Sequence, residues 1–150
     1  MEFRSQQDID APCAQVFAAL TDFPALERRI MHRGARIRRL DAPPAAGAGA
    51  EWEARFRLRG RERQLHLVLN RCEAPSHLGL EGGSPAFAVA GTIELIALGP
   101  RSTRMSVVFT TRPRTMPARL ALQSLRLARG RLQARFDAAV ARLALDMAAR

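Results

Sequence analysis

Three histidines and one close pair of carboxylates are the residues of this sequence that could carry acid–base chemistry. His66 and His77 fall on predicted strands among apolar residues, and His32 falls on a predicted short helix. An imidazole titrates close to neutral pH and can act as a general base. No two of the three have the spacing of a metal-ligand pair, so outward-facing histidines with ordinary hydrogen-bond partners are the simpler interpretation.

Glu51 and Glu53 stand two residues apart on one predicted strand, so their side chains share a face. They could act as a catalytic carboxylate pair, but arginines of a neighbouring strand offer them simpler partners. The sequence contains no nucleophile elbow, no phosphate-binding loop and no paired-cysteine motif. We therefore assign no catalytic residue, no metal site and no cofactor, and a non-enzymatic role is favoured over an enzymatic one.

The charge of the chain is strongly positive. Its 24 basic residues are all arginine and face 14 acidic residues, for a formal net charge of +10. Arginines at positions 55, 57, 59, 61 and 63 alternate through a predicted hairpin. One tryptophan and no tyrosine leave little for base stacking, so a solvated outer face is favoured. We expect no specific nucleic-acid partner, and a module that binds nucleic acid or an acidic partner is the least favoured function.

Length and composition predict one domain over residues 1–150. Cys13 and Cys72 form no metal or disulfide framework, and we expect free thiols. The N-terminus has no apolar signal region, and no apolar run approaches the roughly 18 residues of a membrane span. These features predict a cytoplasmic protein without a transmembrane segment. They leave the oligomeric state unknown.

The positions of apolar residues predict the order of the elements. A strand over residues 2–10 precedes two short helices, the first over 12–20 with Asp10 as its cap and the second capped by Asp22 and ended by Gly34. A strand over 35–41 and a loop rich in Pro and Gly follow. From Glu51 the apolar residues recur with period two through five further strands, separated by turns at 60–61, 74–76, 82–85 and 99–100.

Beyond Pro117 the apolar residues recur with the period of a helix, expected over 117–149. One stripe of that helix holds Leu125, Leu132, Phe136, Ala139, Leu143 and Met147. Short turns between successive strands imply an antiparallel meander. The predicted fold is therefore α+β, a curved seven-stranded antiparallel sheet wrapped around a long C-terminal helix, with two short helices between strands 1 and 2.

Two local motifs add a family resemblance to this order. Residues 9–22 read IDAPCAQVFAALTD, which resembles the opening pattern I-x-A-P-x-x-x-V-F/W-x-x-L-T/S-D of the START-like, or polyketide cyclase (SRPBCC), superfamily. Residues 49–52, GAEW, are similar to the opening of that family's third strand, and the long terminal helix also matches. The resemblance covers the whole chain and implies the helix-grip fold. Many START-like cyclases use a tyrosine for acid chemistry, and this chain has none.

The resemblance also implies an apolar cavity between the sheet and the terminal helix, with a fully packed core as the alternative. We expect the cavity to bind a small hydrophobic or amphipathic ligand, such as a lipid, a polyketide or an isoprenoid. A polyketide cyclase or aromatase acting in the same cavity is the enzymatic alternative. Its sign would be a histidine or acidic side chain pointing into an empty pocket. The residues expected to line the site are Phe56, Leu58, Leu67, Leu69, Leu78, Phe87, Val89, Ile93, Met105, Val107, Phe109, Leu125, Leu132 and Phe136.

Gly130 lies midway along the predicted helix, where glycine is unfavourable. It is either neutral on an exposed face or the site of a local bend. A bend there would let the segment from Leu122 to Leu125 swing over the cavity mouth, while Phe136 stays anchored in the core.

Overall fold

A computed structural model describes residues 1–58 and 60–148, with Leu58 as backbone only. Within the described residues the chain forms seven strands, four helices and a short 3₁₀ turn. They follow the order β1 (Glu2–Ile9), α1 (Cys13–Leu20), α2 (Phe23–His32), β2 (Arg36–Arg39), β3 (Glu51–Leu58), β4 (Arg61–Glu73), β5 (His77–Gly83), β6 (Phe87–Gly99), β7 (Ser102–Pro113), α3 (Met116–Leu125), η1 (Arg126–Ala128) and α4 (Arg129–Ala148).

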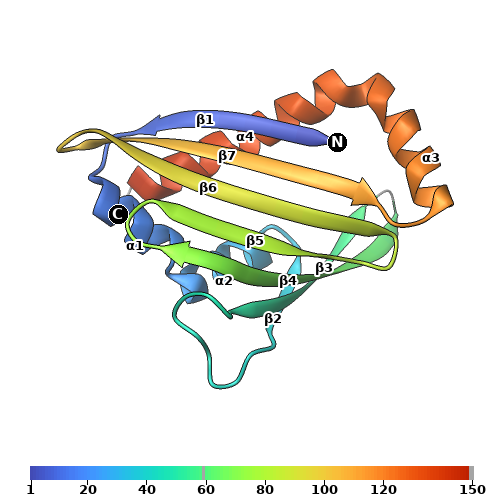
Figure 1. Cartoon of the computed structure of the whole chain (residues 1–150), viewed down its shortest axis with the longest axis horizontal. Coiled ribbons are helices and arrows are strands. Elements are labelled where there is room, and N and C mark those ends of the chain that lie inside the picture. The colour runs from blue at the N-terminus through green and yellow to red at the C-terminus, as the bar shows by residue number, and fades with distance from the viewer. Residues whose placement is uncertain (59, 149–150) are drawn as a thin grey trace.

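The strands form one antiparallel sheet in the order β1-β7-β6-β5-β4-β3-β2. Every neighbour from β2 to β7 is also the next strand along the chain, as a meander requires, and β1 closes the far edge against β7. Figure 1 shows the curved sheet with α1, α2 and α4 on one side of it. The predicted α+β helix-grip fold is thereby confirmed.

The C-terminal helix is bent, and the bend precedes Gly130. The single helix expected over 117–149 is divided into α3, η1 and α4. In Figure 1, α3 turns away from the line of α4 at the end of β7. Gly130 is the second residue of α4; it is exposed, and a Cβ atom added there would meet open space. The bend therefore lies at 126–128 and does not use the glycine.

Two smaller predictions, the cap of α1 and one member of the buried stripe of α4, are wrong by one or two residues. Pro12, not Asp10, occupies the cap position of α1, because the helix begins at Cys13. On α4, Val140 is buried and Ala139 is exposed, so Val140 replaces Ala139 in the buried stripe, while Met147 is buried as predicted. The cap of α2 is as predicted, since Asp22 accepts a hydrogen bond from the backbone N–H of Ala25 at 3.3 Å.

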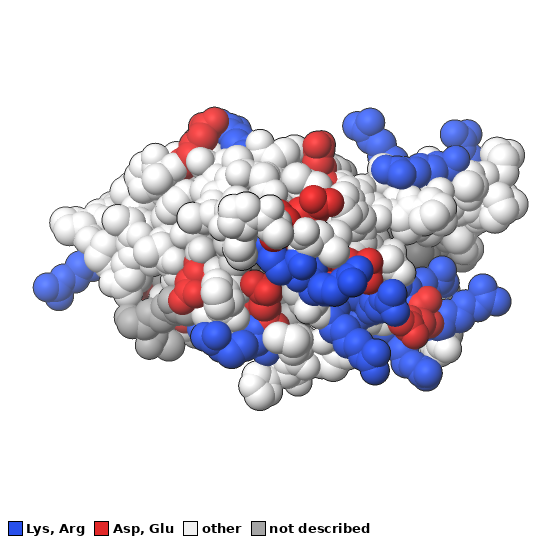
Figure 2. Space-filling model, turned by 90° about the horizontal axis from the view of Figure 1, so that it is seen from below, with Lys and Arg blue, Asp and Glu red and all other residues white. Residues whose placement is uncertain are grey.

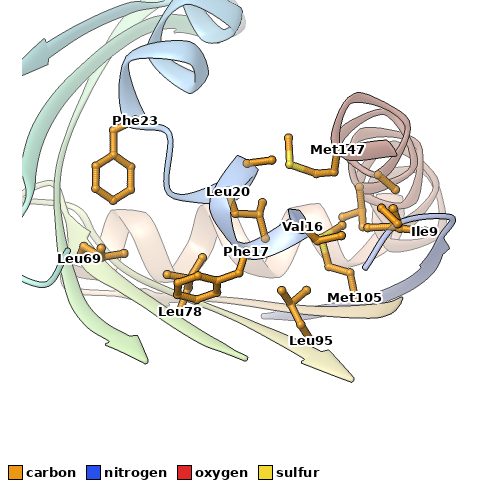
Figure 3. Close-up of a cluster of buried hydrophobic side chains, with 14 of the residues drawn as sticks. Ile9, Val16, Phe17, Leu20, Phe23, Leu69, Leu78, Leu95, Met105 and Met147 are labelled. Carbon is orange, nitrogen blue, oxygen red and sulfur yellow. The ribbon is translucent and has the colours of Figure 1, made fainter. Parts of the chain in front are cut away.

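One end of the space between sheet and helices is filled by side chains. Ile9, Val16, Thr103, Met105 and Met147 are all less than 2% exposed, and we call this cluster the packed end. They come from β1, α1, β7 and α4, and Figure 3 shows the four apolar members gathered beside one another. The hydroxyl of buried Thr103 donates to the carbonyl oxygen of Ala11 at 2.8 Å, which satisfies the polar group in this core.

The first turns of α4 are fastened to the edge strand β1. Arg129 donates to the carbonyl oxygen of Glu2 at 2.9 Å, and Gln133 donates to that of Arg4 at 2.9 Å. The guanidinium of Arg129 also lies 5.5 Å from the ring centre of Phe3. These contacts cover part of an edge whose backbone groups would otherwise be open to pairing.

Candidate functional site

A cavity of about 450 Å³ occupies the other end of the same space, between the concave face of the sheet, α2 and α4. Sites for small molecules in proteins have volumes of about 300–1,000 Å³ and are mostly apolar. The lining is mainly aliphatic and aromatic, and we call this region the hollow end. Its lining residues are Leu20, Phe23, Leu26, Glu27, Ile30, Ile37, Trp52, Leu65, Leu67, Leu69, Leu78, Gly79, Leu80, Val89, Ala90, Gly91, Thr92, Ile93, Val107, Val108, Phe109, Phe136 and Leu143.

Helix α2 presents one stripe to the cavity. Phe23, Leu26, Glu27 and Ile30 all line it, and their spacing of three and four residues places them on a single helix face. Ile30 is 41% exposed as well as part of the lining, so it marks the rim of the cavity. The stripe thus runs from the buried wall at Phe23 to solvent at Ile30.

Glu27 is the ionisable side chain of the lining, and it interrupts an otherwise apolar stripe. It is half-buried, and its carboxylate forms no hydrogen bond or ion pair with another described residue. The surface of the cavity is formed by apolar atoms, so Glu27 lines it with its methylene groups and not with its carboxylate.

Gly91 helps to leave the cavity empty. It lies on β6 between Val89 and Ile93, which face the cavity from the same side of the strand. A Cβ atom added at Gly91 would have its nearest neighbour, the carbonyl oxygen of Val108, at 3.8 Å. A larger side chain at this position would therefore extend into the cavity without a backbone clash.

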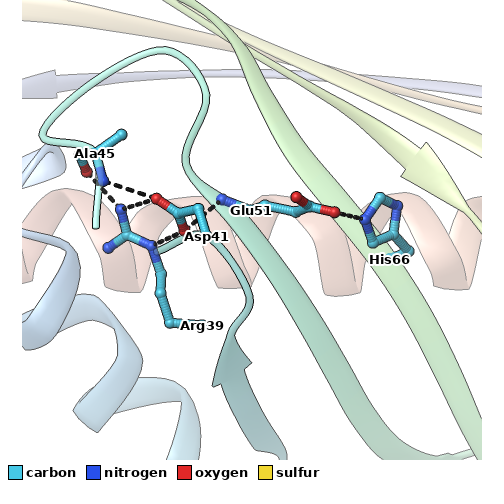
Figure 4. Close-up of polar contacts among 5 residues, drawn as sticks. All are labelled: Arg39, Asp41, Ala45, Glu51 and His66. Atoms are coloured by element: carbon cyan, nitrogen blue, oxygen red, sulfur yellow. Dashed lines mark hydrogen bonds and ion pairs between the residues drawn. The ribbon is translucent and has the colours of Figure 1, made fainter. Parts of the chain in front are cut away.

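A largely buried ion pair between Arg39 and Asp41 supports one wall of the cavity. Phe23 and Trp52 meet edge to face with ring centres 5.2 Å apart, and the guanidinium of Arg39 lies 5.4 Å and 5.1 Å from those two rings. Arg39 in turn is paired with Asp41, as Figure 4 shows. The two aromatic rings are thus held by a charged group whose own position is fixed.

Asp41 also organises the loop that precedes β3. Its carboxylate accepts hydrogen bonds from the backbone N–H of Ala45 at 2.7 Å and of Glu51 at 3.0 Å, besides those from Arg39. The hydrogen bond from Arg39 is the largest cause that holds the pKa of Asp41 well below its ordinary value, and the backbone donors add to it. The loop, its arginine and the aromatic wall therefore form one connected unit.

Eight of the fourteen residues predicted for the site line this cavity. Leu67 and Leu69 do so from β4, Leu78 from β5, Val89 and Ile93 from β6, Val107 and Phe109 from β7, and Phe136 from α4. Phe136 also contacts the rings of Phe3 and Phe109, with centres 5.8 Å and 6.5 Å away. Which of the eight touch a ligand stays a prediction.

Five of the other predicted residues lie outside the lining, and the sixth, Leu58, has its side chain outside the described residues. Met105 is fully buried at the packed end, where the opposing helices come close. Phe87 begins β6 and Phe56 approaches the end of β3, so both lie beyond the cavity. Leu125 belongs to α3, which turns away, and Leu132 precedes Phe136 by one turn. The segment from Leu122 to Leu125 therefore does not cover the cavity.

The lining residues that the sequence did not predict include the stripe on α2 and several residues of the strands. Leu26 and Ile30 lie one helix turn apart in the sequence, and extending that spacing to Phe23 and Glu27 would have identified the whole stripe. Trp52 was recognised as part of a family motif without being placed in a wall. Glu27 is the polar member of this stripe.

The remaining polar candidates face away from the cavity. His66 is exposed and contacts Glu51 on the neighbouring strand, while Glu53 pairs with Arg38 and Arg55, both at 3.1 Å. The carboxylate pair is therefore engaged by outer-face partners. His77 contacts Ser76 at 2.7 Å.

The outer face of the sheet carries part of the arginine row and a second hollow. Arg55 and Arg57 lie on that face, whereas Arg63 pairs with Phe56 and so lies on the opposite face, as Arg61 does. All four arginines are exposed, and Arg59 lies outside the described residues. The outer face expected for the whole row is therefore wrong for Arg61 and Arg63. The hollow, at β4–β7, is lined by His66, Glu81 and Arg112 among others and is not enclosed by a helix.

Within residues 1–58 and 60–148, no group of three or more His, Cys, Asp or Glu side chains is arranged to hold a metal ion. No helix in this part of the chain is both long and apolar enough to cross a bilayer.

A curved antiparallel sheet that grips a C-terminal helix around an apolar cavity defines the helix-grip class of proteins. Within that class, the chain belongs to the family described as polyketide cyclase / dehydrase and lipid transport, whose sequence profile matches residues 1–148. No curated protein sequence matches the chain.

Several solved structures share the fold. The protein TTHA0849 from Thermus thermophilus is 19% identical with a TM-score of 0.71, and the match covers 99% of this chain and 98% of that one. The Zhui aromatase/cyclase from Streptomyces sp. R1128 is 12% identical with a TM-score of 0.68, covering 98% and 93%. Norcoclaurine synthase from Thalictrum flavum, in complex with dopamine and hydroxybenzaldehyde, is 10% identical with a TM-score of 0.63, covering 83% and 76%. At these identities the likeness shows the fold alone.

Proposed function

We propose that this protein binds a small, mainly apolar molecule, such as a lipid, a polyketide or an isoprenoid, in the cavity at the hollow end. The observation that carries the proposal is an unfilled volume of about 450 Å³ with a predominantly apolar lining. Burying apolar ligand surface there is favourable by about 25 cal/mol per Å². The family description, which includes lipid transport, agrees with this assignment.

Filling the cavity tests the proposal directly. Gly91→Leu adds a side chain on the inward face of β6, and we expect the binding of the neutral apolar dye N-phenyl-1-naphthylamine to weaken about 10-fold or more, a loss of about 1.4 kcal/mol. Binding is followed by dye fluorescence and by energy transfer from Trp52, the single tryptophan, which lies in the cavity wall.

Ala97→Leu is the matched control, because Ala97 lies on the same strand β6, is exposed and is not part of the cavity lining. It should bind the dye as the unmodified protein does. Thermal unfolding of both variants shows whether the fold is kept. If Gly91→Leu folds and still binds the dye at full strength, the dye occupies another site and the proposal is wrong.

A cyclase-type reaction in the same cavity is the second candidate, and the observation that favours it is Glu27, whose methylene groups line the cavity. A rotation of this side chain would bring its carboxylate to a bound poly-β-ketone, where it can remove a proton and return it to another oxygen or carbon. General acid–base catalysis by one group contributes about 10²–10⁴-fold to a rate. The same group would serve a purely binding protein as an anchor for a hydrogen-bond donor of the ligand.

Glu27→Gln distinguishes a catalytic base from a ligand anchor, because glutamine keeps the size and shape of the side chain but cannot accept the proton. If Glu27 is the base, the cyclisation of a poly-β-keto thioester, followed by the absorbance of the aromatic product, should slow by about 10²-fold or more. Binding of the neutral dye should stay unchanged. Glu81→Gln, at an exposed carboxylate on the outer face, is the control. If the unmodified protein does not cyclise any such thioester, a cyclase function on poly-β-keto thioesters is excluded. The proposal that the cavity binds an apolar ligand is unaffected by that result.

A further inference from the structure

Helix α3 carries apolar side chains on two opposite faces. Ala118 is buried and Leu122 and Leu125 are half-buried, and this face holds the helix against the end of β7. Met116 and Leu120 point the other way and are 66% and 60% exposed.

Leu127 follows in η1 at 96% exposure. It lies two residues beyond Leu125, the last residue of α3. We call Met116, Leu120 and Leu127 the outer α3 face.

The segment of the chain that contains this face carries only basic charge. Residues 95–136 contain nine arginines and no aspartate or glutamate. Arg114, Arg119 and Arg126 flank the outer α3 face, are exposed, and form no ion pair with another described residue. Figure 2 shows basic side chains gathered toward the end of the molecule at which α3 lies in Figure 1. Exposed aliphatic side chains among unpaired cations are the features of a helix that lies in a bilayer interface.

We propose that the outer α3 face docks this protein on an anionic lipid bilayer. Met116, Leu120 and Leu127 enter the boundary between headgroups and acyl chains, and Arg114, Arg119 and Arg126 contact lipid phosphates. A nucleic acid fits this surface less well, because no aromatic residue lies between Phe109 and Phe136 to stack on a base. The inference stands on the surface of α3 and η1 and does not depend on what the cavity holds.

Co-sedimentation with lipid vesicles tests the proposal. The full chain should bind vesicles made of equal parts of phosphatidylcholine and phosphatidylglycerol, and bind vesicles of phosphatidylcholine alone much more weakly. Added salt should weaken the binding, since the lipid charge is then screened. Each of Arg119→Gln and Arg126→Gln should lower the partition coefficient about 5-fold.

The apolar part of the interaction has a matched control. Leu120→Ser and Leu127→Ser should each lower the partition coefficient about 10-fold, because each removes apolar surface from the interface. Leu145→Ser changes a leucine that is 71% exposed on α4, beside Asp146, and should have no effect. Circular dichroism of each variant confirms that the exposed substitutions leave the fold intact.

Three results would overturn the inference. The first is equal binding of the unmodified protein and of the Leu120→Ser/Leu127→Ser double variant. The second is a dimer in light scattering that dissociates in the double variant while vesicles are not bound, which would assign the face to a second copy of the chain. The third is salt-sensitive binding of an oligonucleotide by a protein that ignores vesicles.

Discussion

The two ends of the space between sheet and helices are built from the same elements and differ in how they are filled. At the packed end, Met105 of β7 and Met147 of α4 are fully buried against α1. At the hollow end, the same strand and the same helix contribute Val107 and Phe136 to the wall of a cavity. Figure 3 shows Phe23 and Leu69, two of the wall residues, on the other side of the cluster from Ile9 and Met147.

The difference follows from which helix faces the sheet and how it is held. At the packed end, α1 brings its buried residues Val16 and Phe17 into the core with α4. At the hollow end, α2 presents a stripe that contains a glutamate, and β6 presents a glycine where a side chain could stand. The Arg39–Asp41 pair secures the aromatic wall in place of interdigitated apolar packing. Stability is thus concentrated at one end, while the other end keeps its shape around an empty volume.

The strongest test of this comparison replaces one leucine by alanine at each end. Leu95 is 4% exposed and paired with Met105, whereas Leu80 lines the cavity. Leu95→Ala should lower the free energy of unfolding by about 2–5 kcal/mol, the range for a close-packed leucine. Leu80→Ala should cost less than about 2 kcal/mol, because its side chain already borders empty space. Equal losses in chemical denaturation would mean that the cavity is not open in solution.

A smaller effect is expected at Asp41, and it depends on pH. The pKa of this carboxyl is lower in the folded protein than in the unfolded chain. Its contribution to stability is therefore fully present above the unfolded pKa of about 3.9 and is lost as the pH falls through the folded value. Asp41→Asn removes that contribution, so the variant should lose less stability than the unmodified protein between about pH 6 and pH 3.

The fluorescence of Trp52 reports whether the loss of the Arg39–Asp41 pair loosens the cavity wall. Its ring lies beneath Arg39, so the loosened loop should shift tryptophan emission to longer wavelength in Asp41→Asn while the packed end stays folded. Asp10→Asn is the control, since Asp10 is exposed and has no ion-pair partner in the described part of the chain. A pH profile that is identical in the variant and the unmodified protein would show that the pair does not support the wall.

Sequence periodicity predicted the faces of the elements well and the cavity only in part. Met105 and Val107 stand two residues apart on the same face of β7, yet one is in the packed core and the other lines the cavity. Alternation shows which way a side chain points, but it does not show how far away the opposite layer lies. The helical period likewise runs through residues 126–128, where the structure bends, and so Leu125 was placed in the site. The helical spacing groups Glu27 with Leu26 and Ile30, but it does not show that α2 borders a cavity.

The smallest expected effect is at Gly130, and it tests whether the hollow end has a moving gate. Arg129 and Gln133 on either side of this glycine donate to the carbonyl oxygens of Glu2 and Arg4 at 2.9 Å, so the first turns of α4 are held on β1. A Cβ atom at Gly130 meets open space, and helical alanine is favoured over glycine. Gly130→Ala should therefore stabilise the protein by about 0.5–1 kcal/mol in chemical denaturation and leave dye binding unchanged. Gly34→Ala serves as the opposite control, because Gly34 has a φ of 94° and alanine there should destabilise. Slower dye entry in Gly130→Ala, measured by stopped flow, would instead mean that the start of α4 must flex to admit a ligand, and the fixed attachment to β1 would be wrong.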